Sequence, residues 1–136
     1  MQAYRLAAIL LASGIWVQFI TASMVVYFDP LNNTFPYTQL VFSWPGVLEE
    51  IHRIWALVIS LILVYALTVF VRNSKSLGSR TVLLSFIVAI LFVLQATFGA
   101  LTIWSYDYPP YVILHEGNAG VLLFSASFLA AICLST

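Results

Sequence analysis

The chain has 136 residues, of which 62% are hydrophobic and only 7% are charged, and its mean hydropathy is +1.03. This composition excludes a water-soluble fold, because soluble domains are nearer half apolar and a quarter charged. It predicts one small integral membrane domain. Five basic and five acidic residues cancel to a net charge of zero, so there is no basic patch that would indicate a nucleic-acid partner.

Four apolar stretches exceed the roughly 20 residues that a helix needs to cross a hydrocarbon core. They cover residues 4–27, 47–71, 81–104 and 111–134. The first is longer than the apolar region of a signal peptide, so we expect it to be a span. Residues 1–136 are therefore predicted to form a single all-α domain, an up-down bundle of four transmembrane helices in contact with membrane lipid. The sequence shows no internal repeat, although the first two spans are laid out much like the last two.

The charges are distributed unevenly between the two ends of the predicted bundle. Four basic residues precede the first span or separate the second from the third: Arg5, Arg72, Lys75 and Arg80. By the positive-inside rule, these ends and both termini face the cytoplasm. All five acidic residues lie toward the other side, where Arg53 is the one basic residue. The first loop, about residues 28–46, is too long for a simple turn and is either a lid over an outward-facing site or a mobile surface loop.

The only two histidines, His52 and His115, each lie just inside the start of an apolar stretch. Ionisable groups are costly at such positions and usually mark a functional site. The second and fourth spans both run inward from the outer surface and are diagonal partners in an up-down bundle, so the two imidazoles should face each other at similar depth. Such a pair suits a six-coordinate haem iron, whereas zinc prefers four ligands. Alternatively, both are buried hydrogen-bonding residues that help the helices to associate.

Charged residues lie close to both histidines. Glu49 stands three residues before His52, so the two project from one helix face. Glu49 is predicted to be a carboxylate near the cofactor that moves protons or stabilises positive charge, or else a helix-start charge with a salt bridge to Arg53. Arg53 is expected to bind a haem propionate. Glu50 and Glu116 rank below Glu49 as candidates.

Two glutamines lie within the apolar stretches and need partners inside the bundle. Gln95 lies one turn before Gly99, whose small size allows a flat ring or a neighbouring helix to come close, and helix packing is the simpler explanation. Gln18 is expected to act mainly in helix packing. Cys133, the only cysteine, permits neither an internal disulfide nor a zinc cluster, and it is expected to be a small packing or lipid-facing residue.

Taken together, these residues resemble the haem A synthase family over the whole chain, and its short archaeal-type members most of all. The resemblance rests on three motifs in this order: Glu49-x-x-His52-Arg53, Gln95-x-x-x-Gly99-Ala100-Leu101-Thr102 and Leu114-His115. It implies a membrane oxidoreductase of terminal oxidase assembly that converts the C8 methyl of haem O to the formyl of haem A. It also implies haem b, haem O or haem A as the iron-containing group. His52 and His115 would then be the axial ligands, with Glu49 near the reacting methyl.

Familiar members of this family have eight helices in two similar halves, one for the substrate haem O and one for a cofactor haem b. The chain corresponds to one such half. The resemblance therefore implies a homodimer or a second four-helix unit, with haem O synthase and terminal oxidase subunits as further partners. It implies a plasma-membrane location with the haem site toward the outer face. The first outer loop lacks the cysteine pair of many bacterial members, so thiol chemistry is not expected there.

Two other functions fit the same sequence. One is a non-enzymatic bis-histidine haem b subunit of a larger respiratory complex, which needs both histidines but not Glu49. The other is a haem-free assembly or scaffold protein, which would tolerate the loss of both histidines.

Overall fold

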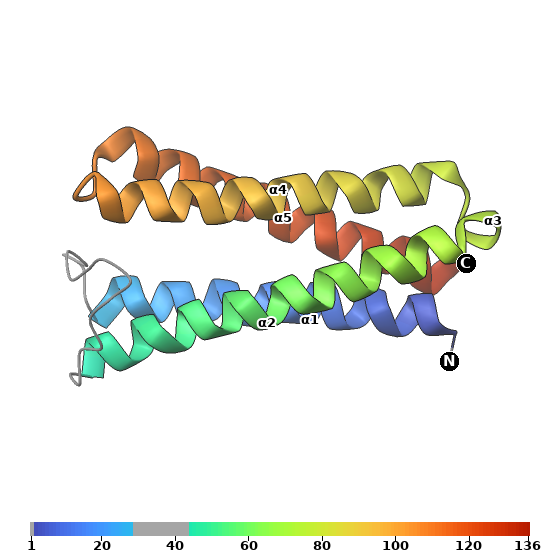
Figure 1. The fold of residues 1–136 in the computed structure, drawn as a ribbon, viewed down its shortest axis with the longest axis horizontal. Coiled ribbons are helices and arrows are strands. Elements are labelled where there is room, and N and C mark those ends of the chain that lie inside the picture. Colours follow the sequence, from blue (N-terminus) through green and yellow to red (C-terminus); the bar gives the residue numbers. More distant parts are fainter. Residues whose placement is uncertain (1, 29–43) are drawn as a thin grey trace.

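The computed structural model describes residues 2–28 and 44–136, and within them four long helices run alternately up and down (Figure 1). These are α1 (Ala3–Phe28), α2 (Trp44–Arg72), α4 (Ser79–Trp104) and α5 (Pro109–Ser135). Each is long and apolar enough to cross a membrane, so the predicted all-α, multi-pass membrane fold is confirmed. The proposed lid over the outer end falls largely on residues 29–43, which lie outside the described part of the chain.

Two helices begin a few residues earlier than predicted because prolines stand in their first turns. α2 begins at Trp44, just before Pro45, and α5 begins at Pro109. The first N–H groups of a helix have no partner within the helix, so a proline there loses no hydrogen bond. The prolines therefore lie inside the helices, whereas the sequence analysis placed them before the helices.

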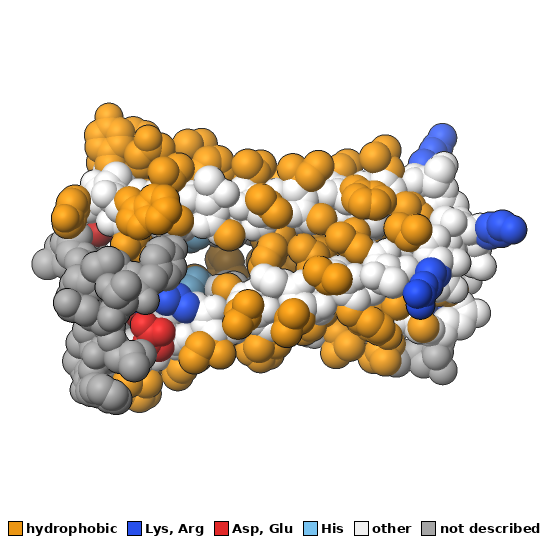
Figure 2. Space-filling view, in the orientation of Figure 1, with side chains coloured by type: hydrophobic (Ala, Val, Ile, Leu, Met, Phe, Trp, Pro, Cys, Tyr) orange, Lys and Arg blue, Asp and Glu red, His pale blue; other side chains and the backbone are white. Residues whose placement is uncertain are grey.

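The connection between α2 and α4 contains a short helix that was not predicted, α3 (Ser74–Leu77). Leu77 is buried against the bundle, and Gly78 follows with a φ of 77°. This left-handed conformation favours glycine, because a side chain would clash with the backbone there. Both chain termini lie at the same end of the bundle as α3, where lysine and arginine side chains gather (Figures 1 and 2).

The long helices are arranged as two pairs. α1 packs along α2, α4 packs along α5, and the pairs are joined mainly where α1 meets α5. The contact between α2 and α4 is much smaller. α2 and α5 therefore occupy diagonal positions, as expected for an up-down bundle.

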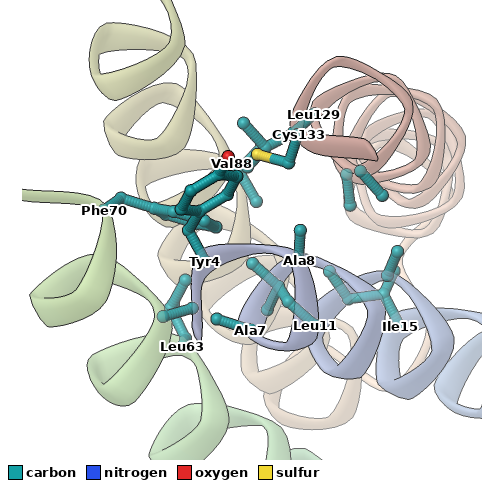
Figure 3. Packing of buried hydrophobic residues seen from close by; sticks show 14 of the residues in the cluster. Tyr4, Ala7, Ala8, Leu11, Ile15, Leu63, Phe70, Val88, Leu129 and Cys133 are labelled. Atoms are coloured by element: carbon teal, nitrogen blue, oxygen red, sulfur yellow. The ribbon is translucent and has the colours of Figure 1, made fainter. Parts of the chain in front are cut away.

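The buried core lies at the end of the bundle that holds the termini, which we call the closed end (Figure 3). Small side chains from α1, α2 and α5 allow the helices to approach closely there, as is usual in membrane bundles. The small core residues are Ala7, Ala8, Ala12, Ala66, Ala126, Ala130 and Cys133. Larger side chains fill the remaining space: Leu11, Ile59, Phe70, Val88 and Leu129. Cys133 is fully buried among them, so it is a packing residue, one of its two predicted roles.

The two helix pairs separate toward the opposite end, which we call the open end (Figure 1). Few residues in this half are buried, since the core cluster draws on the first half of α1 and α4 and the second half of α2 and α5. Apolar side chains cover much of the outer surface (Figure 2), as contact with lipid requires. The fold is thus a bundle held together at one end and open between its pairs at the other.

The closed end should be sensitive to added volume. Ala126 is only 2% exposed, so we expect Ala126→Leu to force its neighbours apart and to lower the free energy of unfolding by about 1–3 kcal/mol. Ala131, which is exposed on the same helix, is the matched control, and Ala131→Leu should change that free energy by less than about 0.5 kcal/mol. Reversible unfolding in mixed detergent micelles measures both. Equal effects would contradict a core at this end.

Candidate functional site

The two histidines lie on opposite sides of the opening between the helix pairs. His52 is eight residues after the start of α2 and His115 is six after the start of α5, which places them roughly 12 and 9 Å along their helices. Figure 2 shows histidine side chains above and below a hollow in the surface near the open end. The structure therefore brings one imidazole from each pair to a shared space.

The proton on His52 can be assigned from its partner on α1. Thr21 Oγ1 donates its hydrogen to the carbonyl oxygen of Gln18 at 2.9 Å, and it also lies 3.1 Å from His52 Nδ1. With that hydrogen on the carbonyl, the hydroxyl oxygen can accept from Nδ1–H of the ring. This arrangement leaves a lone pair on His52 Nε2.

His115 has the same tautomer for a simpler reason. Its Nδ1 lies 3.2 Å from the backbone carbonyl oxygen of Gln95 on α4. A carbonyl oxygen only accepts, so Nδ1 is the donor and Nε2 carries the lone pair. In metal-binding histidines the second ring nitrogen usually donates to a carbonyl or another fixed acceptor, which orients the ring. Both histidines therefore have the protonation and the support that metal ligands require.

A glutamine amide from the neighbouring helix lies against each imidazole. Gln18 Nε2 is 2.9 Å from Nε2 and 3.1 Å from Nδ1 of His52. Gln95 Nε2 is 3.1 Å from Nδ1 and 3.3 Å from Nε2 of His115. In each case the amide nitrogen is almost equally far from the two ring nitrogens, so it lies against the ring and not in the direction of one lone pair. Each histidine is thus surrounded by groups from the other helix of its own pair.

A second polar contact joins the helices of each pair one turn deeper. Trp55 Nε1, on α2, donates to the carbonyl oxygen of Gly14 on α1 at 2.9 Å. Asn118 Nδ2, on α5, donates to the carbonyl oxygen of Leu91 on α4, also at 2.9 Å. Each donor is three residues after a histidine, and each acceptor is four residues before a glutamine. The two pairs therefore share one contact pattern with equal spacing, although the sequence shows no repeat.

Gly99 is close to His115. A Cβ added at Gly99 would lie 2.9 Å from Cε1 and 3.4 Å from Nδ1 of that ring, which is too close for the ring to stay in place. The absence of a side chain allows the imidazole to pack directly against α4. Gly99 was expected to allow the close approach of either a flat ring or a neighbouring helix. In this structure the group that comes close is the His115 ring of the neighbouring helix α5.

Three charged groups form a cluster on α2 beside His52. Arg53 makes ion pairs with Glu49 and, at 2.8 Å, with Glu50. Glu49 is buried, with 6% exposure, so the guanidinium offsets the cost of a carboxylate in an apolar setting. The predicted salt bridge between Glu49 and Arg53 is therefore present. On the α5 side the charged neighbour of the histidine is the exposed Glu116, so the two halves of the site differ in charge.

The donor set fits a haem iron better than a metal ion held by the protein alone. Among the described residues, no three His, Cys, Asp or Glu side chains come together in a metal-binding cluster. Two imidazoles on opposite sides of an opening would supply the two ligands that a porphyrin leaves unfilled. The residues that would hold the haem are His52 and His115. Arg53, which follows His52 in the sequence, would bind a carboxylate of the haem.

Comparison with known protein families identifies the family of the chain. A family model described as COX15-CtaA, cytochrome oxidase assembly protein, matches residues 1–127. The chain belongs to this family. The resemblance to haem A synthases is therefore confirmed, and with it a role in cytochrome oxidase assembly. No curated protein and no solved structure gives a significant match.

Sequence reasoning missed several residues that complete the site. It assigned Gln18 to helix packing, and the amide does join α1 to α2, but its partner there, His52, was not foreseen. It did not consider Thr21, Trp55 or Asn118 as part of the site. The available signal was spacing, because Gln18 and Thr21 lie three apart on one helix face and polar side chains in an apolar span need nearby partners.

The close contact at Gly99 gives a direct test. We expect Gly99→Ala to displace the His115 ring, to change its ¹⁵N resonances, and to lower the free energy of unfolding by about 1–3 kcal/mol. Gly120 has nothing within 4 Å of an added Cβ, so Gly120→Ala is the matched control. It should leave His115 unchanged and be neutral or stabilising by up to about 1 kcal/mol. Unchanged His115 resonances in Gly99→Ala would show that the ring does not pack on α4.

Proposed function

We propose that the chain is a haem A synthase-like oxidoreductase that converts the C8 methyl group of haem O to a formyl group. Membership of a cytochrome oxidase assembly family supports this reaction. The observation that carries the proposal is the matched pair of imidazoles, each donating from Nδ1 to an acceptor on its neighbouring helix and each left with a lone pair on Nε2. His52 and His115 are the proposed axial ligands.

When bound, the haem would supply the redox centre for a four-electron oxidation of the methyl carbon to an aldehyde, in which the four electrons pass to an external electron acceptor and water supplies the oxygen atom. The chain's own residues would bind the ring, orient it and handle protons. Glu49 is the proposed catalytic carboxylate, because it is buried on the same helix face as His52 and is suited to hold a proton or stabilise positive charge. Arg53 and Gln95 are proposed to help bind the haem, and Gly99 allows the His115 ring to lie close to α4.

The distribution of charge supports an orientation in the membrane. Basic side chains gather at the closed end, where both termini lie (Figure 2). The positive-inside rule puts this end in the cytoplasm and the histidines toward the outer face of the plasma membrane. With only two histidines, one chain has one bis-histidine pair. We therefore propose that it acts as a homodimer or with a second four-helix unit, near haem O synthase or oxidase subunits.

The count of histidines also favours one alternative. A single bis-histidine pair is sufficient for an electron-carrying haem b subunit of a respiratory complex, which would need no catalytic carboxylate. The two functions differ in what they require of Glu49.

The haem content tests the binding site. Protein purified in detergent from cells that make haem O should contain haem O or haem A, identified by chromatography and mass after extraction. His52→Ala and His115→Ala should each lose most of the bound haem, because each removes one axial ligand. Haem-free wild-type protein from such cells would contradict the proposal.

The carboxylates test the reaction. Glu49→Gln should keep the bound haem but lower the rate of haem A formation by about 100-fold or more, since it removes a group that can move a proton. Glu50→Gln is the matched control, because Glu50 also pairs with Arg53 but is more exposed. It should change the rate only slightly. Full haem A formation in Glu49→Gln would exclude a catalytic Glu49, and haem b with no haem A in the wild type would favour the electron-carrying subunit.

A further inference from the structure

The closed end of the bundle carries most of the positive charge of the chain. Four of the five lysine and arginine residues lie there: Arg5 in the first turn of α1, Arg72 at the end of α2, Lys75 in α3 and Arg80 in the first turn of α4. Figure 2 shows basic side chains gathered at this end. All of them except Arg5, which is half-buried, are exposed. We call these four residues the basic rim.

The acidic side chains that the structure describes lie at the other end of the molecule. They are Glu49 and Glu50 near the start of α2, Asp107 in the turn after α4, and Glu116 near the start of α5. Between described residues, salt bridges join Arg53 to its two neighbouring glutamates, and none involves the basic rim. A helix of 26 residues such as α4 is about 39 Å long, several times the screening length of about 8 Å at physiological salt. The acids of the open end therefore do not neutralise the basic rim.

The starts of two helices add to the positive potential at the basic rim. Both α1 and α4 begin at the closed end, and neither has an acidic residue in its first turn. The start of a helix carries a partial positive charge, which favours acidic side chains nearby and disfavours basic ones. Arg5 and Arg80 therefore stand where their own helices disfavour them. An anion from outside the chain would stabilise both.

The depth of the basic rim in the membrane indicates which anions can reach it. Arg72 directly follows the apolar stretch of α2, and Arg80 directly precedes that of α4. These side chains therefore lie at the level of the lipid headgroups of one leaflet. Arginine binds phosphate oxygens through paired N–H donors, and basic clusters beside membrane spans attract anionic lipids.

We propose that the basic rim binds the phosphate headgroups of anionic phospholipids in the leaflet at the closed end. The structure supports a fixed arrangement of these cations, because buried Leu77 attaches α3 to the bundle and all four long helices contribute to the core beside it. Bound headgroups would offset the repulsion between the cations and so stabilise the packing of that core. This inference goes beyond the proposed function and does not depend on haem binding.

The affinity for a short-chain phospholipid tests the basic rim. Full-length protein in a neutral detergent is titrated with anionic dioctanoyl phosphatidylglycerol or with zwitterionic dioctanoyl phosphatidylcholine, and binding is followed by calorimetry against protein-free micelles. The anionic lipid should bind at least about tenfold more tightly. Salt at about 1 M, where the screening length is about 3 Å, should remove most of this difference. Equal affinities at low salt would overturn the proposal.

Charge variants show whether the lipid binds at the closed end. Lys75→Gln and Arg80→Gln alter exposed side chains, and each should weaken binding of the anionic lipid by about fivefold. Arg80→Lys keeps the charge and should bind almost as well as the wild type. Glu116→Gln is the matched control, because it makes the chain more positive at the open end, and it should leave the affinity unchanged. A gain in Glu116→Gln as large as the loss in the rim variants would show that net charge attracts the lipid, which would overturn a local site.

Inorganic phosphate distinguishes a lipid site from a site for soluble phosphate. It shares the charge of the headgroup but lacks acyl chains in the membrane to hold it beside the basic rim. It should therefore displace the anionic lipid only at concentrations far above that of the lipid. Displacement by phosphate at concentrations similar to that of the lipid would overturn the phospholipid as the occupant.

Discussion

The arrangement of the site depends on one constraint, that a polar group inside a membrane bundle must find its partner within the protein. Each imidazole meets this constraint inside its own helix pair, His52 through Thr21 and His115 through the Gln95 carbonyl oxygen. These bonds fix the Nδ1 proton and so determine which nitrogen remains available. Among the described residues, each ring makes its hydrogen-bond contacts within its own helix pair, and the two rings lie on opposite sides of the opening.

The fold divides stability and binding between its two ends. Alanines and Cys133 let α1, α2 and α5 pack closely at the closed end, where most buried residues lie. At the open end the helices of each pair are joined by polar contacts such as Trp55 to Gly14. Two helix pairs that each keep their own hydrogen bonds can stand apart with most of their polar groups satisfied, although Gln18 Oε1 is buried without a partner among the described residues. An open site in an otherwise apolar bundle is stable for this reason.

Much of the fold and of the candidate site was predictable from the sequence, and the exceptions have physical causes. Apolar runs longer than 20 residues allow few alternatives to membrane helices, and the i, i+4 spacing of Glu49 and Arg53 favours an ion pair on one helix face. The short helix α3 was missed because four residues in a polar loop carry no periodic signal, and it depends on the burial of Leu77. The contacts of Gln18 were missed because helices that are apolar all round do not reveal which sides meet.

Because the two helix pairs share a core only at the closed end, a small tilt there moves the open end of each pair by a larger distance. From Ala66, in the core, to His52 the α2 axis extends about 20 Å. A tilt of about five degrees at the closed end would therefore move the imidazole by about 2 Å, comparable to the length of a metal–nitrogen bond. Small side chains far from the histidines thus control the distance between the two imidazoles. Lipid thickness and neighbouring subunits, which bear on helix tilt, would act on the site through the same geometry.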